Sequence, residues 1–279
     1  MQYIEVETSL RQVDPYRDLL IDALGNEGPY DSFEETPHGL KAYVPKDQFD
    51  EAFLQAALSS LSLTSTPYTV SEMPDKDWNE AWERTHQAVL VEDFCWVRAP
   101  FHEPRQDVRY DIVIEPKMSF GTAHHATTYM MLSYLRDLAL DGCTVLDMGC
   151  GTAVLAILAA RCGAARVDAI DIDEWAYRNA LENVERNGVA DKVHCALGDA
   201  AHLPADTYDV VLANINRNIL LADMARYRAA MRPSATLLLS GFYEADVPVL
   251  LEKAADLGLT LEEKRTRDGW CALRVKRND

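Results

Sequence analysis

The feature that most constrains this chain is a short glycine-containing run from Val145 to Thr152, which reads VLDMGCGT. It follows an apolar segment predicted as a buried strand at Thr144–Asp147 and precedes one predicted as a helix at Val154–Cys162. Glycines at such a junction permit tight turns and a close approach of the backbone to a ligand. Because open α/β folds bind ligands at the carboxyl ends of their strands, the run predicts a ligand site at this turn.

The order of residues in this run indicates the charge of the ligand. A dinucleotide site reads G-x-G-x-x-G/A, whereas this chain has Val154 at the third position and Asp147 two residues before Gly149. A carboxylate there disfavours a pyrophosphate and favours a cationic group. The pattern D-x-G-x-G suits the amino-acid part and the sulfonium of S-adenosylmethionine, so Gly149 and Gly151 are predicted to bind this cofactor.

Two further side chains follow predicted strands at the same edge of the sheet. Asp171 ends a strand at Val167–Asp171, where its carboxylate can accept hydrogen bonds from both ribose hydroxyls. Asn214 follows a strand at Tyr208–Ala213, and its amide can hold the amino-acid part of the cofactor or the incoming nucleophile, or it caps the next helix. NAD-dependent enzymes also use an acid like Asp171, so a dinucleotide site and a turn without a ligand remain alternatives.

From about residue 126 the sequence alternates helix and strand signals, which is typical of a doubly wound, mostly parallel sheet. Further helices are predicted at Thr127–Leu138, Glu174–Asn187, Ile219–Ala230 and Asp246–Leu257, and further strands at Val193–Leu197, Thr236–Phe242, Leu261–Arg265 and Cys271–Lys276. Too few residues separate the last two strands for a crossover helix. We therefore expect them to form an antiparallel hairpin at one end of the sheet.

The first 70 residues follow a different pattern, with strand and helix signals in the order βαββαβ. This order predicts a small α+β ferredoxin-like module. A short helix with Trp78 and Trp82 on one face is expected after it. The predicted domains are therefore a module at residues 1–70, a linker region at 71–100 and an α/β domain at 101–279.

The charge of the chain limits its partners. It has 27 Lys and Arg against 45 Asp and Glu, a formal net charge of −18, and residues 1–60 alone hold 12 acids and 4 bases, a net of −8. Such a surface repels phosphate backbones and attracts basic proteins, which disfavours a nucleic-acid partner. The alternative is that the acidic residues only keep the protein soluble.

The remaining composition indicates a cytoplasmic protein. No apolar run approaches the ~18 residues of a membrane span, and the alternating amino-terminus does not read as a signal peptide. The six cysteines include no C-x-x-C pair, which favours reduced and mostly buried thiols. We expect a monomer that contacts no membrane.

The segment Ser119–Thr128 is predicted as a loop that leads into a helix. Thr127 or Thr128 is placed to cap this helix or to contact a ligand. His124 and His125 are neighbours, and neighbouring histidines rarely converge on one ion, so we predict no metal site.

These motifs together carry a resemblance to a known family. Ser119–Thr128, Asp147–Gly151, Asp171–Asp173 and Ala213–Ile215 look like the corresponding segments of the bacterial methyltransferases of large-subunit ribosomal protein eleven (PrmA). The similarity covers most of residues 75–279, and the amino-terminal module matches in order and size.

The resemblance implies a class I (Rossmann-like) S-adenosylmethionine-dependent methyltransferase domain, joined to a ferredoxin-like domain that docks the ribosomal protein. It also implies transfer of methyl groups to lysine ε-amines and to the N-terminal amine of that protein. By motif position, Thr128, Gly149, Asp171 and Asn214 would bind the cofactor. Family members usually read F-G-T-G-T-H-P-T-T in the loop and glycine after the first motif. In this chain, Ala123, His124 and Ala126 replace the glycine, threonine and proline of that loop, and Ala153 replaces the glycine after the first motif.

The chemistry requires a neutral amine in line with the methyl group, which is chiefly a matter of positioning. We assign this role to Asn214 and expect no dedicated strong base, with the proton leaving to solvent or a weak base. The acidic module is expected to dock the basic target. The alternatives are a methyltransferase of another protein or a small amine, an NAD-dependent oxidoreductase, and a non-catalytic binding module.

Overall fold

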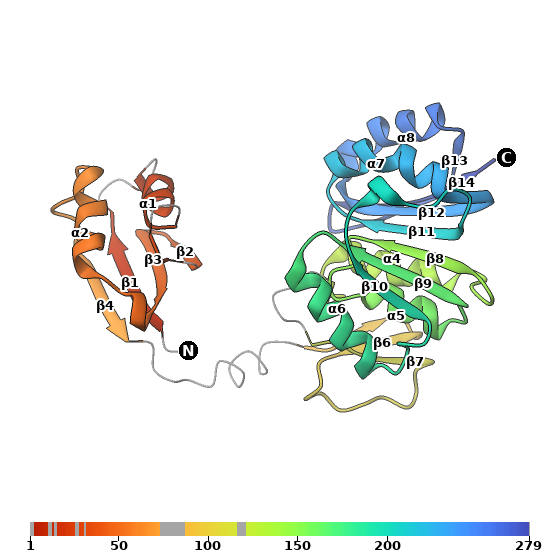
Figure 1. Ribbon diagram of the computed structural model, residues 1–279, viewed down its shortest axis with the longest axis horizontal. Helices are drawn as coiled ribbons and strands as arrows, with labels where there is room; N and C mark the ends of the chain where they lie inside the picture. Colours follow the sequence, from red (N-terminus) through yellow and green to blue (C-terminus); the bar gives the residue numbers. More distant parts are fainter. Residues whose placement is uncertain are drawn as a thin grey trace. The chain divides into compact units, whose positions relative to one another are not determined.

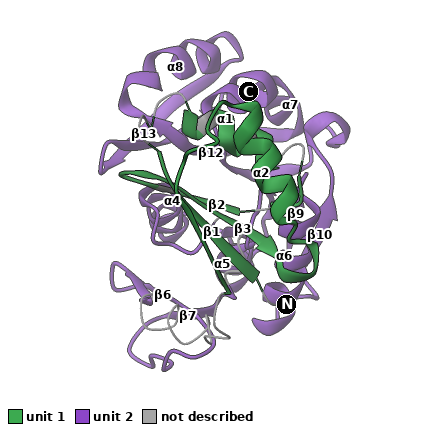
Figure 2. Ribbon diagram, turned by 90° about the vertical axis from the view of Figure 1, so that its left-hand side faces the viewer, with its two compact units in different colours: residues 1–85 green, residues 86–279 purple. Residues whose placement is uncertain are grey.

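The computed structural model describes residues 3–10, 13, 16–25, 28–30, 32–72, 87–115 and 121–278. The chain forms two compact units, residues 1–85 and 86–279 (Figure 2). The helix predicted around Trp78 and Trp82 lies outside the described residues, as do Ser119 and Phe120 of the predicted loop.

The first unit has the predicted ferredoxin-like order. Its elements are β1 (Tyr3–Ser9), α1 (Tyr16–Gly25), β2 (Ser32–Thr36), β3 (Gly39–Pro45), a 3-10 turn (Lys46–Gln48), α2 (Glu51–Ser60) and β4 (Tyr68–Glu72). The strands form an antiparallel sheet in the order β2-β3-β1-β4. Ile4 and Val6 of β1 point toward α1 and α2 and form a core with Leu20 and Leu54. The alternate residues Glu5 and Glu7 are left on the open face of the sheet.

The second unit contains the predicted doubly wound sheet (Figure 1). Its strands are β8 (Thr144–Met148), β9 (Arg166–Asp171), β10 (Val193–Leu197), β11 (Tyr208–Asn214), β12 (Met231–Tyr243), β13 (Leu259–Arg267) and β14 (Trp270–Arg277). They lie in the order β10-β9-β8-β11-β12-β14-β13, and the first five run parallel. β13 and β14 form the expected antiparallel hairpin at one end of the sheet, with β14 antiparallel to β12.

Helices cover both faces of this sheet. They are α4 (Ala126–Arg136), α5 (Val154–Arg161), α6 (Glu174–Arg186), α7 (Arg217–Ala230) and α8 (Val247–Asp256), with 3-10 turns at Ala200–His202 and Glu244–Asp246. Val145 of β8 packs in one core with α4, α5 and α6, whereas the next residue, Leu146, packs in another with α7 and α8. This alternation, which follows the two-residue period of a strand, places the helices in two layers.

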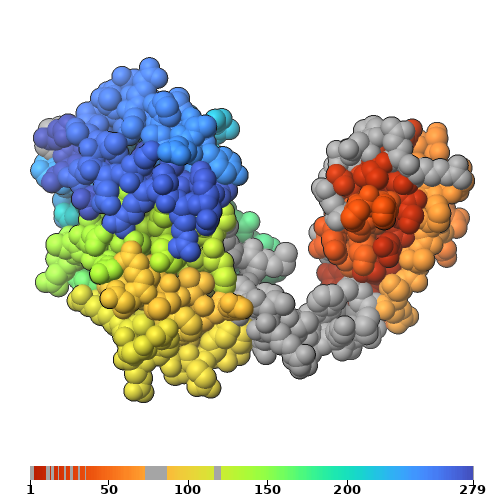
Figure 3. Space-filling view, turned by 180° about the vertical axis from the view of Figure 1, so that it is seen from behind, coloured from red at the N-terminus to blue at the C-terminus, as the bar shows by residue number. Residues whose placement is uncertain are grey.

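A second, three-stranded sheet precedes these elements. It consists of β5 (Val89–Val91), β6 (Cys95–Arg98) and β7 (Tyr110–Val113). In Figure 3 these residues, orange to yellow, lie at the end of the second unit opposite the blue carboxyl-terminal elements. None of the helices in the described ranges is long and apolar enough to cross a membrane.

Candidate cofactor and acceptor site

The glycine-containing run forms the turn between β8 and α5, as its residues predict. The N–H groups of Gly149 and Cys150 donate to the Ile170 carbonyl oxygen, at 2.8 and 3.1 Å. Gly149 has a φ of +71°, and a Cβ on it would lie 2.3 Å from Cγ2 of Ile215. Only glycine satisfies both the left-handed backbone and this close approach, so the turn and the segment after β11 pack directly together.

Asp171 lies beside this turn, at the carboxyl end of β9. Its Oδ2 accepts from the Gly151 N–H at 2.9 Å, and its Oδ1 accepts from the Asp173 N–H at 3.0 Å. A carboxylate has about four acceptor positions, so both oxygens keep capacity for ligand hydroxyls. The structure therefore brings Gly149, Gly151 and Asp171 together at one edge of the sheet.

Asp147 supplies a buried carboxyl beneath the same turn. Its side chain is 1 % exposed, and its Oδ2 accepts from the Ala156 N–H at 3.0 Å. Burial raises the pKa of Asp147 from 3.8 to about 7; the Ala156 N–H opposes this shift and the nearby Asp171 charge adds to it. A cation above the turn would stabilise the ionised form, which fits the prediction of a cationic ligand.

Asn214 and Thr128, 86 residues apart in the sequence, meet on the other side of the turn. The Asn214 Nδ2 donates to the Thr128 Oγ1 at 3.2 Å. The Asn214 Oδ1 is buried and has no hydrogen-bond partner among the described residues. Asn216, not Asn214, caps the following helix, because its side chain accepts from the Ile219 N–H. The helix-cap alternative for Asn214 is therefore wrong, and its amide oxygen is available to a donor from a ligand.

The start of α4 differs in one respect from the sequence interpretation. His125 caps the helix, since its Nδ1 accepts from the Thr127 N–H, while Thr127 and Thr128 are both fully buried. Thr128 thus faces Asn214 rather than capping the helix. Ala123 and Ala153 both adopt left-handed backbone, with φ of +66° and +63°, at the two positions where the resembled family has glycine.

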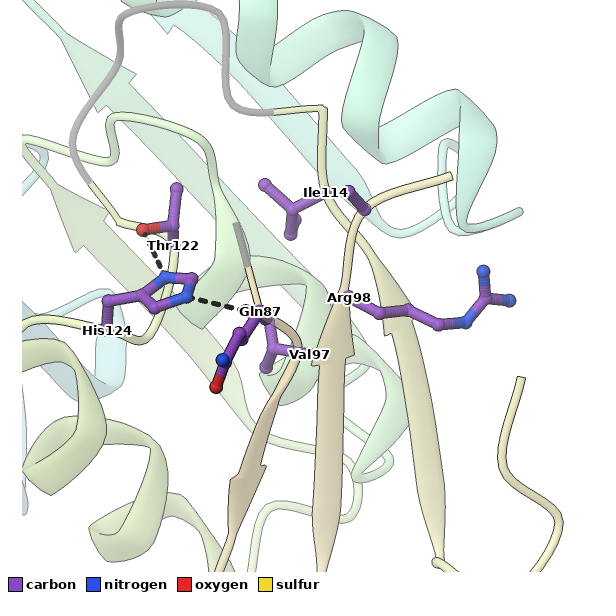
Figure 4. Close-up of a pocket in the computed structure, with 7 residues that line it drawn as sticks. Gln87, Val97, Arg98, Ile114, Thr122 and His124 are labelled. Atoms are coloured by element: carbon purple, nitrogen blue, oxygen red, sulfur yellow. Dashed lines mark hydrogen bonds between the residues drawn. The ribbon is translucent and has the colours of Figure 1, made fainter. Parts of the chain in front are cut away.

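His124 connects the loop before α4 to the start of the second unit (Figure 4). Its Nδ1 lies 3.0 Å from the Thr122 Oγ1, and its Nε2 lies 2.6 Å from the Gln87 carbonyl oxygen. The small pocket around it is lined by Gln87, Val97, Arg98, Ala99, Ile114, Thr122 and His124. Across the described residues, no group of three or more His, Cys, Asp or Glu side chains is placed to hold a metal ion.

An aromatic cluster near this edge was not anticipated from the sequence. The Trp270 ring lies 4.1 Å from the Tyr243 ring and 4.6 Å from the His125 ring, measured between centroids. His125 begins the helix that carries Thr128, and Ser240 of β12 pairs with both Asn214 and Ala272. Tyr243 of β12 and Trp270 of β14 are directly paired across the two strands. Their contact joins two separate segments, so the periodicity of either segment alone could not predict it.

Comparison with known proteins identifies the family. The family described as ribosomal protein L11 methyltransferase (PrmA) matches residues 20–278. A ribosomal protein L11 methyltransferase of Porphyromonas gingivalis is 46 % identical over 261 residues, which cover 92 % of this chain and 89 % of that protein. One from Phocaeicola vulgatus is 40 % identical over 278 residues, covering 98 % and 99 %.

This chain belongs to the PrmA family of ribosomal protein L11 methyltransferases. The resemblance inferred from its motifs is confirmed, and the NAD-dependent oxidoreductase alternative is excluded by this membership. The crystal structure of a ribosomal protein L11 methylase from Lactobacillus delbrueckii subsp. bulgaricus has the same fold, with a TM-score of 0.61 at 24 % identity. It covers 70 % of this chain, and the chain covers all of it.

Proposed function

We propose that this PrmA-family chain transfers methyl groups from S-adenosylmethionine to the lysine ε-amines and the N-terminal amine of ribosomal protein L11. The observation that supports this proposal best is the unpartnered, buried amide oxygen of Asn214 beside the glycine turn. The amine that receives the methyl group carries N–H groups, and one of these can donate a hydrogen bond to this oxygen.

The residues of the turn fit S-adenosylmethionine, which supplies an electrophilic methyl group when bound. We assign its binding to Thr128, Gly149, Gly151, Asp171 and Asn214. Asp171 has acceptor capacity for the ribose hydroxyls, and Gly149 and Gly151 have no side chain to obstruct the approach of the ligand. The buried carboxyl of Asp147 would add negative potential beneath the turn in its ionised form, which a bound cation would favour.

Asn214 then positions the amine for attack. Bound S-adenosylmethionine would supply the methyl group, and Asn214 would hold the amine nitrogen in line with it, so that the N–C bond could form as the S–C bond breaks. Correct placement of the two reactants can contribute ~7–11 kcal/mol in favourable cases. The amine must be neutral, and a lysine in solution has a pKa of ~10.4, so an enclosed site assists by disfavouring the cation. The proton leaves to solvent or a weak base, without a dedicated strong base in the chain.

His125 fits this view of proton transfer. Burial lowers the pKa of His125, and its Nδ1 is occupied by the cap of α4, 2.7 Å from the Thr127 Oγ1. This histidine therefore serves the start of the helix that carries Thr128 rather than acting as a strong base.

We assign docking of the basic target to residues 1–70. On the open sheet face of this unit, Lys41 is the basic partner of Glu5, while Glu7 and Glu34 add two further carboxylates. Such a face attracts a cationic protein and repels nucleic acid. We infer that the enzyme acts in the cytoplasm as a monomer, with neither a membrane nor a nucleic acid as partner.

The replacement Asn214→Ala tests the catalytic assignment, and Asn216→Ala is its matched control two residues away. We expect Asn214→Ala to lower kcat/KM for L11 roughly 100-fold or more, because a positioned polar group at the reacting atoms is lost. Asn216→Ala should cost about 1 kcal/mol of stability through the lost helix cap and leave turnover within a few-fold of the wild type. Equal losses of activity in the two variants would refute the assignment of Asn214.

A further inference from the structure

Three buried asparagines follow one another along α6, two within the helix and the third at its C-cap. Asn179, Asn183 and Asn187 are spaced four residues apart and are 2 %, 0 % and 4 % exposed. Asparagine is a poor helix former, and a buried amide is costly unless it is hydrogen-bonded. An apolar face would pack against the sheet at lower cost, so these amides require a specific role.

The side chains of these asparagines form hydrogen bonds with backbone groups of Val113, the last residue of β7, and of Glu115. In this they resemble the backbone of a neighbouring strand. The Asn187 Oδ1 accepts from the Val113 N–H at 3.0 Å, and its Nδ2 donates to the Val113 carbonyl oxygen at 2.7 Å. Two residues on, the Asn183 Oδ1 accepts from the Glu115 N–H at 2.8 Å. The Asn179 Nδ2 donates to the Glu115 carbonyl oxygen at 2.9 Å.

Asn183 makes a contact with the glycine turn that Asn179 and Asn187 do not make. Its Nδ2 donates to the Thr152 carbonyl oxygen at 3.1 Å, within the turn that follows Gly151. The Thr152 hydroxyl in turn donates to the Gly121 carbonyl oxygen at 2.6 Å. Thr152 is therefore held from two sides, by α6 through Asn183 and by the chain before α4 through Gly121.

This arrangement connects the parts of the cofactor site to one side chain. The Gly151 N–H, one residue before Thr152, donates to Asp171, and α6 itself begins directly after Asp173. Movement of Thr152 would displace the Gly151 amide from the Asp171 carboxylate. The Asn183 side chain also accepts from the Glu115 N–H, so it holds Thr152 against the segment that follows β7.

We propose that Asn183 is a positioning residue for the cofactor, which holds the glycine turn at Thr152 in the arrangement that binds S-adenosylmethionine. The inference rests on the proposed function only in the identity of that ligand. Asn187, the C-cap of the same helix, has similar burial and the same type of backbone pairing but no contact with the turn, so it serves the fold alone.

The test compares Asn183→Ala with Asn187→Ala in the full chain, by calorimetric titration with S-adenosylmethionine and by thermal unfolding without it. Both variants should lower Tm by similar amounts, because each leaves buried backbone groups unpaired. Asn183→Ala should raise the Kd for S-adenosylmethionine about 10-fold or more, equivalent to about 1.4 kcal/mol. Asn187→Ala should change it less than about twofold, a small fraction of that free energy.

A second variant covers the case in which Asn183→Ala does not fold. Asn183→Asp keeps the volume and the acceptor for the Glu115 N–H, but its carboxylate cannot donate to Thr152. We expect the same weakened binding at pH 8. Equal Kd values for wild type, Asn183→Asp and Asn187→Ala would overturn the positioning role and leave the proposed function intact. A wild-type chain that binds no S-adenosylmethionine would overturn the proposed function and this role with it.

Discussion

Asp147 lies in an environment very different from that of an ordinary surface carboxyl. It is enclosed beneath the glycine turn, with one backbone N–H as its hydrogen-bond donor. One hydrogen bond offsets only part of the loss of hydration, so the protonated form is favoured in the folded protein. We interpret the ionised Asp147 carboxylate as destabilising the ligand-free protein, and we expect a cation bound above the turn to offset this destabilisation.

Replacing Asp147 with Asn should change how stability depends on pH. Burial raises the pKa of Asp147 in the folded state to about 7, above its unfolded value of 3.8, so the folded state holds the proton more tightly. The contribution of Asp147 to the stability of the wild type therefore falls as pH rises from about 4 to about 7, and Asp147→Asn removes this contribution. The variant should gain roughly 2–4 kcal/mol relative to the wild type between pH 4 and pH 8.

Urea unfolding of both proteins without ligand, at several pH values, measures this difference. The two stability curves should converge near pH 4 and separate toward pH 8. Curves that stay parallel across this range would show that Asp147 is ionised in the folded protein.

At the residue scale, the sequence indicates the side chains of the candidate site but not their contacts. Gly149, Gly151 and Asp171 follow from the strand-turn-helix pattern, because they lie at strand ends in one region of the chain. The contact of Thr128 with Asn214 spans 86 residues and depends on how α4 crosses the sheet. The role of Asn183 could not be predicted, because an asparagine on a helix usually belongs to an exposed polar face and the sequence does not show its buried partners.

At the scale of elements, the carboxyl-terminal hairpin is held to the rest of its unit by α4. The buried Tyr134 hydroxyl lies 3.2 Å from the Glu263 carbonyl oxygen and 3.3 Å from that of Ala272, one on each strand of the hairpin. Arg265 of β13 lies over the Tyr134 ring, 4.0 Å from its centroid. These contacts fix β13 and β14 against the helix that carries Thr128.

Tyr134→Phe and Tyr227→Phe form a matched pair that tests this role. Both tyrosines are fully buried, but the Tyr227 hydroxyl has no hydrogen-bond partner in the described part of the chain. We expect Tyr134→Phe to lower the free energy of unfolding by about 1 kcal/mol, since the buried hydroxyl's hydrogen bond to the hairpin backbone is lost. Tyr227→Phe should leave it unchanged or raise it, as removing an unpaired hydroxyl costs nothing. Equal destabilisation, measured by denaturant unfolding, would contradict this account.

The elements themselves follow closely from hydrophobic periodicity. The alternating helices and strands after residue 126, and the hairpin at the sheet end, are present as predicted. The parallel pairing of β6 with β7 could not be predicted, because the chain between Ala99 and Arg109 contains no crossover helix to indicate it. Pairing across such a connection depends on packing against α5, which a single sequence does not reveal.

At the scale of the whole molecule, the net negative charge should affect the rate at which the enzyme and a basic substrate meet. Because the first unit presents Glu5, Glu7 and Glu34 on its open sheet face, we expect electrostatic attraction to accelerate encounter with a basic protein. Charges on exposed surfaces are screened within ~8 Å at physiological ionic strength, so this effect should depend strongly on salt.

The double replacement Glu7→Lys with Glu34→Lys should therefore raise the KM for L11 roughly threefold or more at low salt, with kcat unchanged. The effect should disappear near 1 M salt, where the screening length is ~3 Å. Asp256→Lys, an exposed acid at the end of α8, is the control for a change in net charge alone. If each reversed charge raised the KM equally in the double variant and in Asp256→Lys, L11 would not dock on the open sheet face.

The measurement that tests the central claim most directly is methyl transfer to ribosomal proteins. Ribosomal proteins from cells lacking this enzyme are incubated with the full chain and S-adenosylmethionine carrying a labelled methyl group, and the products are analysed by mass spectrometry. We predict label on lysine side chains or the N-terminus of L11. Label on a different protein, or none on L11 despite tight binding of S-adenosylmethionine, would contradict the proposed substrate.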